Sequence, residues 1–517
     1  MRLNAAFMII SEKNRKWWAL SGLSMACLVG YLDFAIVNTA LPAIQKELGV
    51  SFVVLQWVMN VFVLALSIFM VNMGRFGDTF GRTTMLFIGL ALFGAASLFS
   101  GLAAGGTMLI IFRALQGLGL AMIIPSSLAL ISNSFPENER GRAIGIWTSV
   151  VGIGLALGPV LGGVITSSLG WRWVFFVNIP VIIAASAVCL LSVREPVGDT
   201  DKRIDWYGFF LMIAGIGSLI TAIIEAPEWG YKSVRTLSLF AAAIICIVSF
   251  YIVETRVRSP IIDFKLFGRR GFISGSLANF TLVASAYSAF FLMPLYLGNI
   301  MRKEAFEIGI LLLPITVLIV AVAPFAGKVV DSKGAKLPIL AGLICLALSA
   351  FIQSTFKQDS SLIYIIFGFT FMGLGWGSMF GSGAFAAISS LPKELAGTAT
   401  GALWTIQNLG GSIGLAVAGV IFRDRERTSL DSGLTGAGIE LTPEQQGLIK
   451  SILSDPENAR HVLSQFTDAM SGRILPIFES AFMKGYSAAF IFILCLCAAA
   501  FIMIALVMKD MKREKTG

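Results

Sequence analysis

The chain has 517 residues, of which 56% are hydrophobic and 13% are charged, and its mean hydropathy is +0.83. This balance excludes a water-soluble globular protein of this length. The net charge of +9 would suit a nucleic-acid-binding protein, but the basic residues lie in short segments between long apolar runs, where membrane topology explains them. We therefore expect an all-α integral membrane protein in a lipid bilayer, with no nucleic-acid partner.

The first apolar run follows Lys13, Arg15 and Lys16 and has no small-residue cleavage site, which favours a retained membrane helix over a cleaved signal peptide. Further apolar runs of roughly 17 to 25 residues, the length that crosses a bilayer, continue along the chain. We predict fourteen spans, at residues 17–38, 52–73, 84–103, 107–131, 142–165, 171–193, 206–226, 234–254, 272–299, 305–327, 337–356, 361–385, 398–421 and 485–508.

The even number of spans places both termini on one side of the membrane. Most Lys and Arg residues of the connecting segments fall on that side, which predicts cytoplasmic termini in a multi-pass protein of the cytoplasmic (inner) membrane. The one sizeable external segment is 423–484. There we predict one or two amphipathic helices, with Thr442 and Ser454 or Asp455 as caps, and a solvent-exposed His461.

Two charged segments repeat one pattern. In "GRFGDTFGR" and "GKVVDSKGAK", Gly74, Asp78 and Gly81 are spaced as Gly327, Asp331 and Gly334. A second pair of segments, "FPENERGRAIGIW" and "LPKELAGTATGALW", recurs at nearly the same offset. The repeats predict two pseudo-symmetric six-helix bundles with two inserted helices. The expected domains are 1–193, an insertion at 194–271 that holds the helices 206–226 and 234–254, and 272–517 with its external segment 423–484.

These segments resemble the major facilitator superfamily, and specifically its fourteen-span drug:proton antiporter branch. In that family, the loop after the second span carries a Gly-x-x-x-Asp-x-x-Gly-Arg pattern, matched by Gly74, Asp78, Gly81 and Arg82. The resemblance implies a cytoplasmic latch whose charges pair in one conformation only, with Asp331 and Gly334 as counterparts in the second half. The alternative is a topogenic loop with solvated charges.

The first span contains "YLDFAIVNTALP", which looks like a signature of this branch. Asp33 would lie about 24 Å along the helix from Trp17. An ionised carboxylate inside the membrane costs about 2.5–3.5 kcal/mol unless it is protonated or meets a cation, as a proton carrier requires. Arg113 of "FRALQGLG" has a comparable depth, so the two could pair or compete for a proton. A purely structural ion pair is the alternative.

The fifth predicted span reads "GIGLALGPVLGG" and matches the antiporter pattern of the branch. Small residues at every fourth position let another helix approach closely, and a proline permits a kink. The matching residues are Gly154, Gly158, Pro159, Gly162 and Gly163. The motif "WRWVFFVNIP", from Trp171 to Pro180, also resembles the branch.

Glu225 is a candidate second acid, although its position near Pro227 and Glu228 also suits an ordinary interfacial residue. Branch members that expel divalent organic cations carry an extra acid in span 13. Here that region offers Gln407 and Asn408, which argues against broad polycation transport.

We therefore expect a proton-coupled multidrug efflux transporter that exports lipophilic neutral or monocationic small molecules by alternating access. A dedicated proton-coupled exporter or importer of one metabolite, such as an amino acid, sugar or siderophore, is the alternative. In a Gram-negative cell, a periplasmic adaptor would be a further partner. The residues assigned to the substrate cavity are Asn38, Trp57, Gln116, Phe290, Tyr296, Gln407 and Asn408.

No catalytic motif, metal-ligand spacing or phosphate-binding loop stands in the sequence, which has one histidine. We therefore expect neither an enzyme nor a bound metal or cofactor. A channel is disfavoured because channels usually arise from symmetric subunits with a filter sequence.

Overall fold

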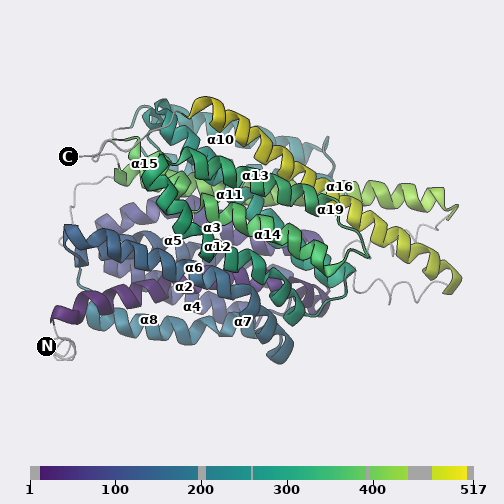
Figure 1. Cartoon of the computed structure of the whole chain (residues 1–517), viewed down its shortest axis with the longest axis horizontal. Coiled ribbons are helices and arrows are strands. Elements are labelled where there is room, and N and C mark those ends of the chain that lie inside the picture. The colour runs from purple at the N-terminus through teal and green to yellow at the C-terminus, as the bar shows by residue number, and fades with distance from the viewer. Residues whose placement is uncertain (1–11, 196–204, 258–259, 392–395, 440–467, 509–517) are drawn as a thin grey trace.

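The structure is a computed structural model, and it describes residues 12–195, 205–257, 260–391, 396–439 and 468–508. Fourteen segments of these residues are helices long and apolar enough to cross a membrane, which confirms the predicted number and the all-α class. The helices lie side by side, and the described ends of the first and last of them lie at the same end of the bundle (Figure 1). We call this end the termini side and the opposite end the distal side.

The first group of helices packs into one body. It comprises α2 (Glu12–Leu48), α3 (Phe52–Phe80), α4 (Arg82–Gly101), α5 (Gly106–Ser134), α6 (Glu137–Leu169), α7 (Trp173–Phe176) and α8 (Asn178–Ser192). Within it, α3 and α4 pack on α5, while α6 and α8 pack on α2. Glycines permit these close contacts: a Cβ on Gly117 of α5 would lie 2.3 Å from the carbonyl oxygen of Phe62 on α3.

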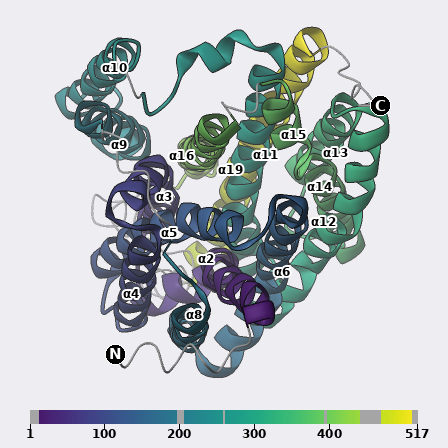
Figure 2. The same ribbon diagram turned by 90° about the vertical axis from the view of Figure 1, so that its left-hand side faces the viewer.

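Two further helices, α9 (Trp206–Trp229) and α10 (Val234–Glu254), pack on each other at the edge of the bundle (Figure 2). The short helix η1 (Phe264–Gly268) leads from them to α11. Helix α9 also contacts α3 and α16. Its apolar face forms a second hydrophobic core with these two helices, built on side chains such as Ile68, Ile220 and Leu403. Helix α9 is therefore packed against the bundle along one side, with α10 packed on α9.

The second group comprises α11 (Arg270–Leu295), η2 (Tyr296–Ile300), α12 (Ala305–Lys333), α13 (Lys336–Ser354), α14 (Leu362–Met379), α15 (Ser382–Ser389), α16 (Ala396–Gly436) and α19 (Asp468–Val507). Helix α16 packs between α11 and α19, and α14 packs between α12 and α13. The break between α14 and α15 occurs at Gly381, which has a φ of +83°, in the left-handed region that glycine adopts readily.

Several helices are longer than predicted. Helix α16 continues to Gly436 and α19 begins at Asp468, so 423–436 and 468–484, predicted as parts of an external loop, are helical. They project beyond the bundle on the distal side (Figure 1). Hydropathy marks only the part of a helix that lies in lipid, so these charged ends gave no span signal. Thr442, Ser454, Asp455 and His461 lie outside the described residues.

The two groups meet along two seams, α6 against α12 and α3 against α16. In the first seam, a Cβ on Gly309 would lie 2.4 Å from the carbonyl oxygen of Pro159. In the second, Gln56 Nε2 donates to the carbonyl oxygens of Leu415 and Ala416, at 3.2 and 3.0 Å. Gln56 and Gly309 lie about one turn from the distal ends of α3 and α12, so both seams are closed on the distal side.

Candidate functional site

The Asp33 carboxylate lies inside the first group of helices and is fully buried. Arg113 of α5 forms an ion pair with its Oδ2 through Nη1. Gln116 Nε2, one turn along α5, donates to Oδ1 at 3.2 Å. Asn178 Nδ2, at the start of α8, donates to the same oxygen at 2.7 Å. The structure thus brings the two predicted proton-coupling residues together and surrounds the carboxylate with three donors.

A second layer orients these donors. Ser97 Oγ of α4 accepts from Gln116 Nε2 at 2.8 Å and from Asn178 Nδ2 at 3.3 Å. Arg113 donates through Nε to the carbonyl oxygen of Val58 on α3, at 3.2 Å. Helices α2, α3, α4, α5 and α8 therefore all contribute to this site, which we call the Asp33 site.

The sequence analysis did not identify Ser97 or Asn178 as site residues. Nothing in the sequence around Ser97 distinguishes it from other serines in apolar helices. Asn178 does stand in the motif "WRWVFFVNIP". Two other residues of that motif, Trp171 and Arg172, contact Glu47 at the distal end of α2. The motif therefore fixes α8 against α2, with Asn178 at the carboxylate.

The Asp33 site contacts the second group through aromatic rings. The Arg113 guanidinium lies over the ring of Phe62, 4.2 Å from its centroid. Phe62 stacks on Phe34, the neighbour of Asp33, at 6.3 Å between centroids. Phe34 in turn lies 4.3 Å from the ring of Tyr287 on α11. A change at the ion pair can therefore reach the second group across three rings.

The glycine motif of α6 joins three helices. A Cβ on Gly158 would lie 2.2 Å from Cβ of Ala35 on α2, and one on Gly162 would lie 2.2 Å from Oγ1 of Thr39. Gly154 likewise faces α2 through Leu28, whereas Gly163 and Pro159 face α12. One face of α6 thus supports the helix that carries Asp33, and the next face forms a seam with the second group.

The predicted latch residues lie at the termini side. Asp78 and Arg82 form an ion pair one turn apart, where α3 ends and α4 begins. Gly81, between them, has a φ of +98°. Glu195, which the sequence analysis did not identify, accepts from the backbone N–H groups of Arg82 and Thr83 at 2.7 and 2.9 Å. These contacts all lie within the first group.

The remaining latch residues occupy ordinary helix positions. Gly74 faces Pro125 of α5, with 3.6 Å between an added Cβ and the proline Cβ. In the second group, Asp331 is exposed near the end of α12, and Gly334 ends that helix with a φ of +87°.

The seven residues assigned to the substrate cavity do not form one cluster. Gln116 belongs to the Asp33 site. Trp57 donates to Glu225 at the edge of α9. Tyr296 donates through its hydroxyl to the carbonyl oxygen of Lys357 near the distal side. The structure therefore places three of the seven in three separate environments.

The contacts of the other four are also separate, and that of Asn408 crosses a seam. Asn38 is buried and donates to the carbonyl oxygen of Phe34. Phe290 packs on Trp376 with 5.4 Å between ring centroids. Gln407 accepts from Asn279 at 3.0 Å, and Asn408 contacts the sulfur of Met70 across the α3–α16 seam.

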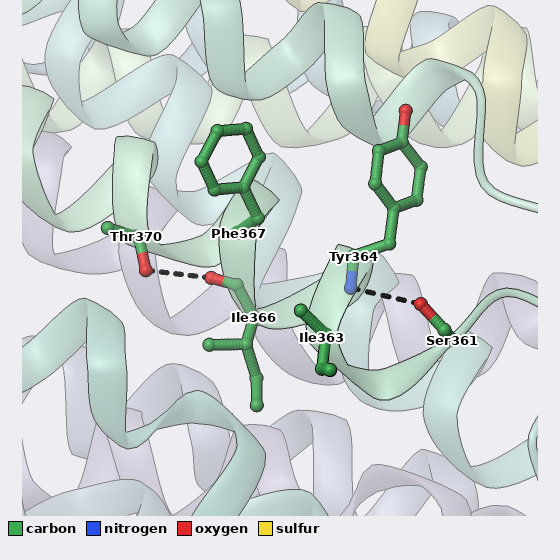
Figure 3. A pocket seen from close by; sticks show the side chains of 6 residues that line it. All are labelled: Ser361, Ile363, Tyr364, Ile366, Phe367 and Thr370. Carbon is green, nitrogen blue, oxygen red and sulfur yellow. Dashed lines mark hydrogen bonds between the residues drawn. The ribbon is translucent and has the colours of Figure 1, made fainter.

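One pocket, of about 430 Å³, lies on α14 and contains none of the predicted residues (Figure 3). It is lined by Ser361, Ile363, Tyr364, Ile366, Phe367 and Thr370. The drawn hydrogen bonds are local to the helix: Tyr364 N donates to Ser361 Oγ, and Thr370 Oγ1 donates to the carbonyl oxygen of Ile366. Ile363 is 81% exposed, so this pocket is a shallow feature of the outer surface.

Known proteins resemble the chain over most of its length. The family model described as "Major Facilitator Superfamily" matches residues 23–415. The "Tetracenomycin C resistance and export protein" of Streptomyces glaucescens is 33% identical over 80% of this chain and 77% of its own. The "Multidrug resistance protein Stp" of Mycobacterium tuberculosis is 32% identical over 83% of this chain and 80% of its own.

Two further similarities bear on substrate and on fold. The "Riboflavin transporter RibZ" of Clostridioides difficile is 28% identical over 78% of this chain and 87% of its own. Among solved structures, a bacterial homologue of the human lysosomal transporter Spinster, in an inward-facing and unoccupied conformation, has a TM-score of 0.67. It covers 97% of this chain and 99% of its own at 16% identity, which shows a shared fold.

Proposed function

Since this chain belongs to the major facilitator superfamily, we propose that it is a proton-coupled efflux transporter of lipophilic neutral or monocationic compounds. Resistance and export relatives that cover most of the chain support drug efflux. The observation that carries proton coupling is the Asp33 site, a buried carboxylate paired with one arginine inside the membrane.

We propose the cytoplasmic membrane as the location, with the termini side in the cytoplasm. The two moving bodies are then residues 1–193 and 272–517, and 194–271 is an insertion. In this assignment, seams closed on the distal side correspond to an inward-facing conformation. In a cell with an outer membrane, we expect a periplasmic adaptor as a partner. We expect no enzymatic activity.

In the proposed cycle, Asp33 takes up a proton from outside and gives it up inside. The ionised carboxylate is stabilised by Arg113, Gln116 and Asn178, whose donors all meet at its two oxygens. Protonation removes the charge that holds Arg113 in place, so the guanidinium can move against Phe62. Through Phe34 and Tyr287, that movement reaches the seam between the two bodies.

The driving force favours substrates of low charge. An entering proton supplies about 2.3 kcal/mol per 100 mV and about 1.4 kcal/mol per pH unit. A monovalent cation that leaves by one-for-one exchange cancels the voltage contribution, whereas a neutral compound does not. Aromatic side chains at the centre, such as Tyr31, Phe34 and Tyr287, suit flat apolar substrates.

The second candidate is a carrier dedicated to one metabolite, and the similarity to a riboflavin transporter favours it. The two functions differ in substrate range. A multidrug exporter transports chemically unrelated compounds, whereas a dedicated carrier saturates with a single one.

The test is dequenching of a pH-sensitive dye in everted, respiring membrane vesicles when neutral and monocationic drugs are added. We expect several unrelated compounds to release protons with the natural chain and none to do so with Asp33→Asn. Silence with every drug would favour the single-metabolite carrier. An active Asp33→Asn variant would remove Asp33 as the proton site.

A further inference from the structure

One turn of the inserted helix α9 joins α3 to α16 near the distal side. Glu225 Oε1 accepts a hydrogen bond from Trp57 Nε1 of α3, at 2.7 Å. One residue earlier, the carbonyl oxygen of Ile224 accepts from Arg423 Nη2 of α16. Glu228 Oε1, in the next turn, lies 3.6 Å from Arg423 Nη1. The inserted helix thus makes polar contacts with both groups of helices at the same level.

These contacts lie beside the closed part of the α3–α16 seam. Gln56, the neighbour of Trp57, donates to two carbonyl oxygens of α16, and Asn60 Nδ2 donates to the carbonyl oxygen of Ser412 at 2.8 Å. Ser412 Oγ also contacts Asn60 Oδ1 at 2.5 Å. Opening this seam requires α9 to lose its contacts with α3 or with α16.

Helix α9 and its flanking loop are also joined to α3 by aromatic and polar contacts away from this turn. Aromatic rings follow the interface toward the termini side: Phe209 lies 5.6 Å from Phe69, and Trp206 lies 5.5 Å from Phe76. At the end of α3, Arg75 donates to the carbonyl oxygen of Pro260, beyond α10. The polar link to α16, in contrast, depends on Arg423.

Arg423 is incompletely paired. Its side chain is 8% exposed, yet Nε and Nη1 have no hydrogen-bond partner. Glu426, one turn along α16, is 4% exposed, and no hydrogen bond or ion pair joins it to another described residue. A buried arginine with unfilled donors beside acidic groups can exchange one partner for another, which is a property of a contact that must break and reform.

We propose that Trp57, Glu225 and Arg423 form a clasp by which the inserted helices hold the distal seam closed, and that Arg423 releases α9 when the seam opens. All three act as positioning residues and need no contact with substrate. Glu225 then belongs to the clasp and carries no transported proton. The proposal goes beyond the proposed function and rests on it only in requiring that the two groups move apart.

The test is a distance measurement between spin labels across the distal side. Labels at Ala104→Cys, between α4 and α5, and Asp359→Cys, between α13 and α14, report on the two groups, and both positions are exposed. The parent chain has its six native cysteines replaced. Arg423→Gln and Trp57→Phe are compared with Arg427→Gln, which removes the same charge from an exposed position one turn along α16.

We expect the parent and Arg427→Gln to share one main short distance. In Arg423→Gln and Trp57→Phe, the ratio of distal-open to distal-closed chains should rise about five- to tenfold. Trp57→Phe keeps the ring, so it carries the test if Arg423→Gln does not fold. Unchanged distances in the folded variants, or an equal shift in Arg427→Gln, would overturn the clasp. The measurement uses no drug, so a failed transport assay does not affect its outcome.

Discussion

Two buried arginines of this transporter have opposite surroundings. Arg113 is fully buried, forms a direct ion pair with Asp33, and contacts partners that all belong to the first group of helices. Arg423 is nearly as buried, but it links α16 to α9 and leaves two nitrogens, Nε and Nη1, without a hydrogen-bond partner, whereas Arg113 leaves one, Nη2. The surroundings of Arg113 suit a buried ion pair inside one rigid group of helices. Those of Arg423 suit a contact between helices that is lost and re-formed in each transport cycle.

The largest expected effect separates the two arginines by stability. Arg113→Gln leaves the Asp33 carboxylate buried without its cation, so we expect the free energy of unfolding to fall by about 3–5 kcal/mol. Arg423→Gln removes a link that is already incomplete and should cost about 1 kcal/mol. Thermal unfolding of the purified variants in detergent measures both. Equal losses in the two variants would show that the two arginines stabilise the fold to the same extent.

A double variant separates the effect of the Arg113 charge from the effect of its side-chain packing. Asp33→Asn combined with Arg113→Gln removes both members of the pair, so most of the stability lost in Arg113→Gln should return. Transport should stay absent, because the proton site is gone. A double variant no more stable than Arg113→Gln would indicate that packing of the arginine side chain, and not its charge, stabilises the first group.

The rigidity of the Asp33 site also depends on how closely α6 approaches α2. Gly158→Ala places a Cβ 2.2 Å from that of Ala35, so we expect a loss of about 1–3 kcal/mol together with weaker transport. Gly152→Ala, on the same helix, meets nothing within 4 Å and is the matched control. If both variants behave alike in thermal unfolding and dye dequenching, the helix contact is unimportant.

Asn178→Ala tests the part that a single neutral donor plays at the Asp33 carboxylate. It removes the 2.7 Å hydrogen bond to Asp33 but leaves the ion pair with Arg113. We expect about 1–2 kcal/mol less stability and a reduced, still measurable, proton release in everted vesicles. Ser192→Ala, a buried residue at the far end of the same helix, is the control. Transport equal to that of the natural chain would show that Asn178 is dispensable.

The smallest effect on stability is expected for Trp57→Phe. It removes one hydrogen bond at a partly exposed position, so the unfolding free energy should change by less than about 1 kcal/mol. Its effect on the distal distances should still be clear, because the clasp acts on the balance between two folded states. A large loss of stability would make Trp57 a core residue of the fold.

The sequence predicted the spans better than the environment of the site. The fourteen apolar runs can be recognised in the sequence because a helix that crosses a bilayer needs a long, mostly apolar segment. The sequence placed Asp33 and Arg113 at comparable depths and predicted that they could pair, and the structure contains that ion pair. Ser97 could not be found, because a serine in an apolar helix gives no sign of the helix face to which it belongs. Its partners lie on the next helix, α5, and on α8, which is 81 residues along the chain.

Hydropathy also did not predict how far the helices continue past the membrane into charged segments. Glu426 lies past the predicted end of its span, yet α16 continues through it and buries it against α19. Trp57 and Glu225 were assigned separately, one to the cavity and one as a second acid, although they are hydrogen-bonded to each other. Contacts between segments so distant in sequence depend on tertiary packing, which no local pattern encodes.

Proton release by the purified protein in lightly buffered detergent, measured when an exported drug is added, tests whether Asp33 carries the transported proton. Coupling through one carboxylate predicts that drug binding displaces about one proton from the natural chain and none from Asp33→Asn. The same release from both proteins would show that the transported proton resides on another group.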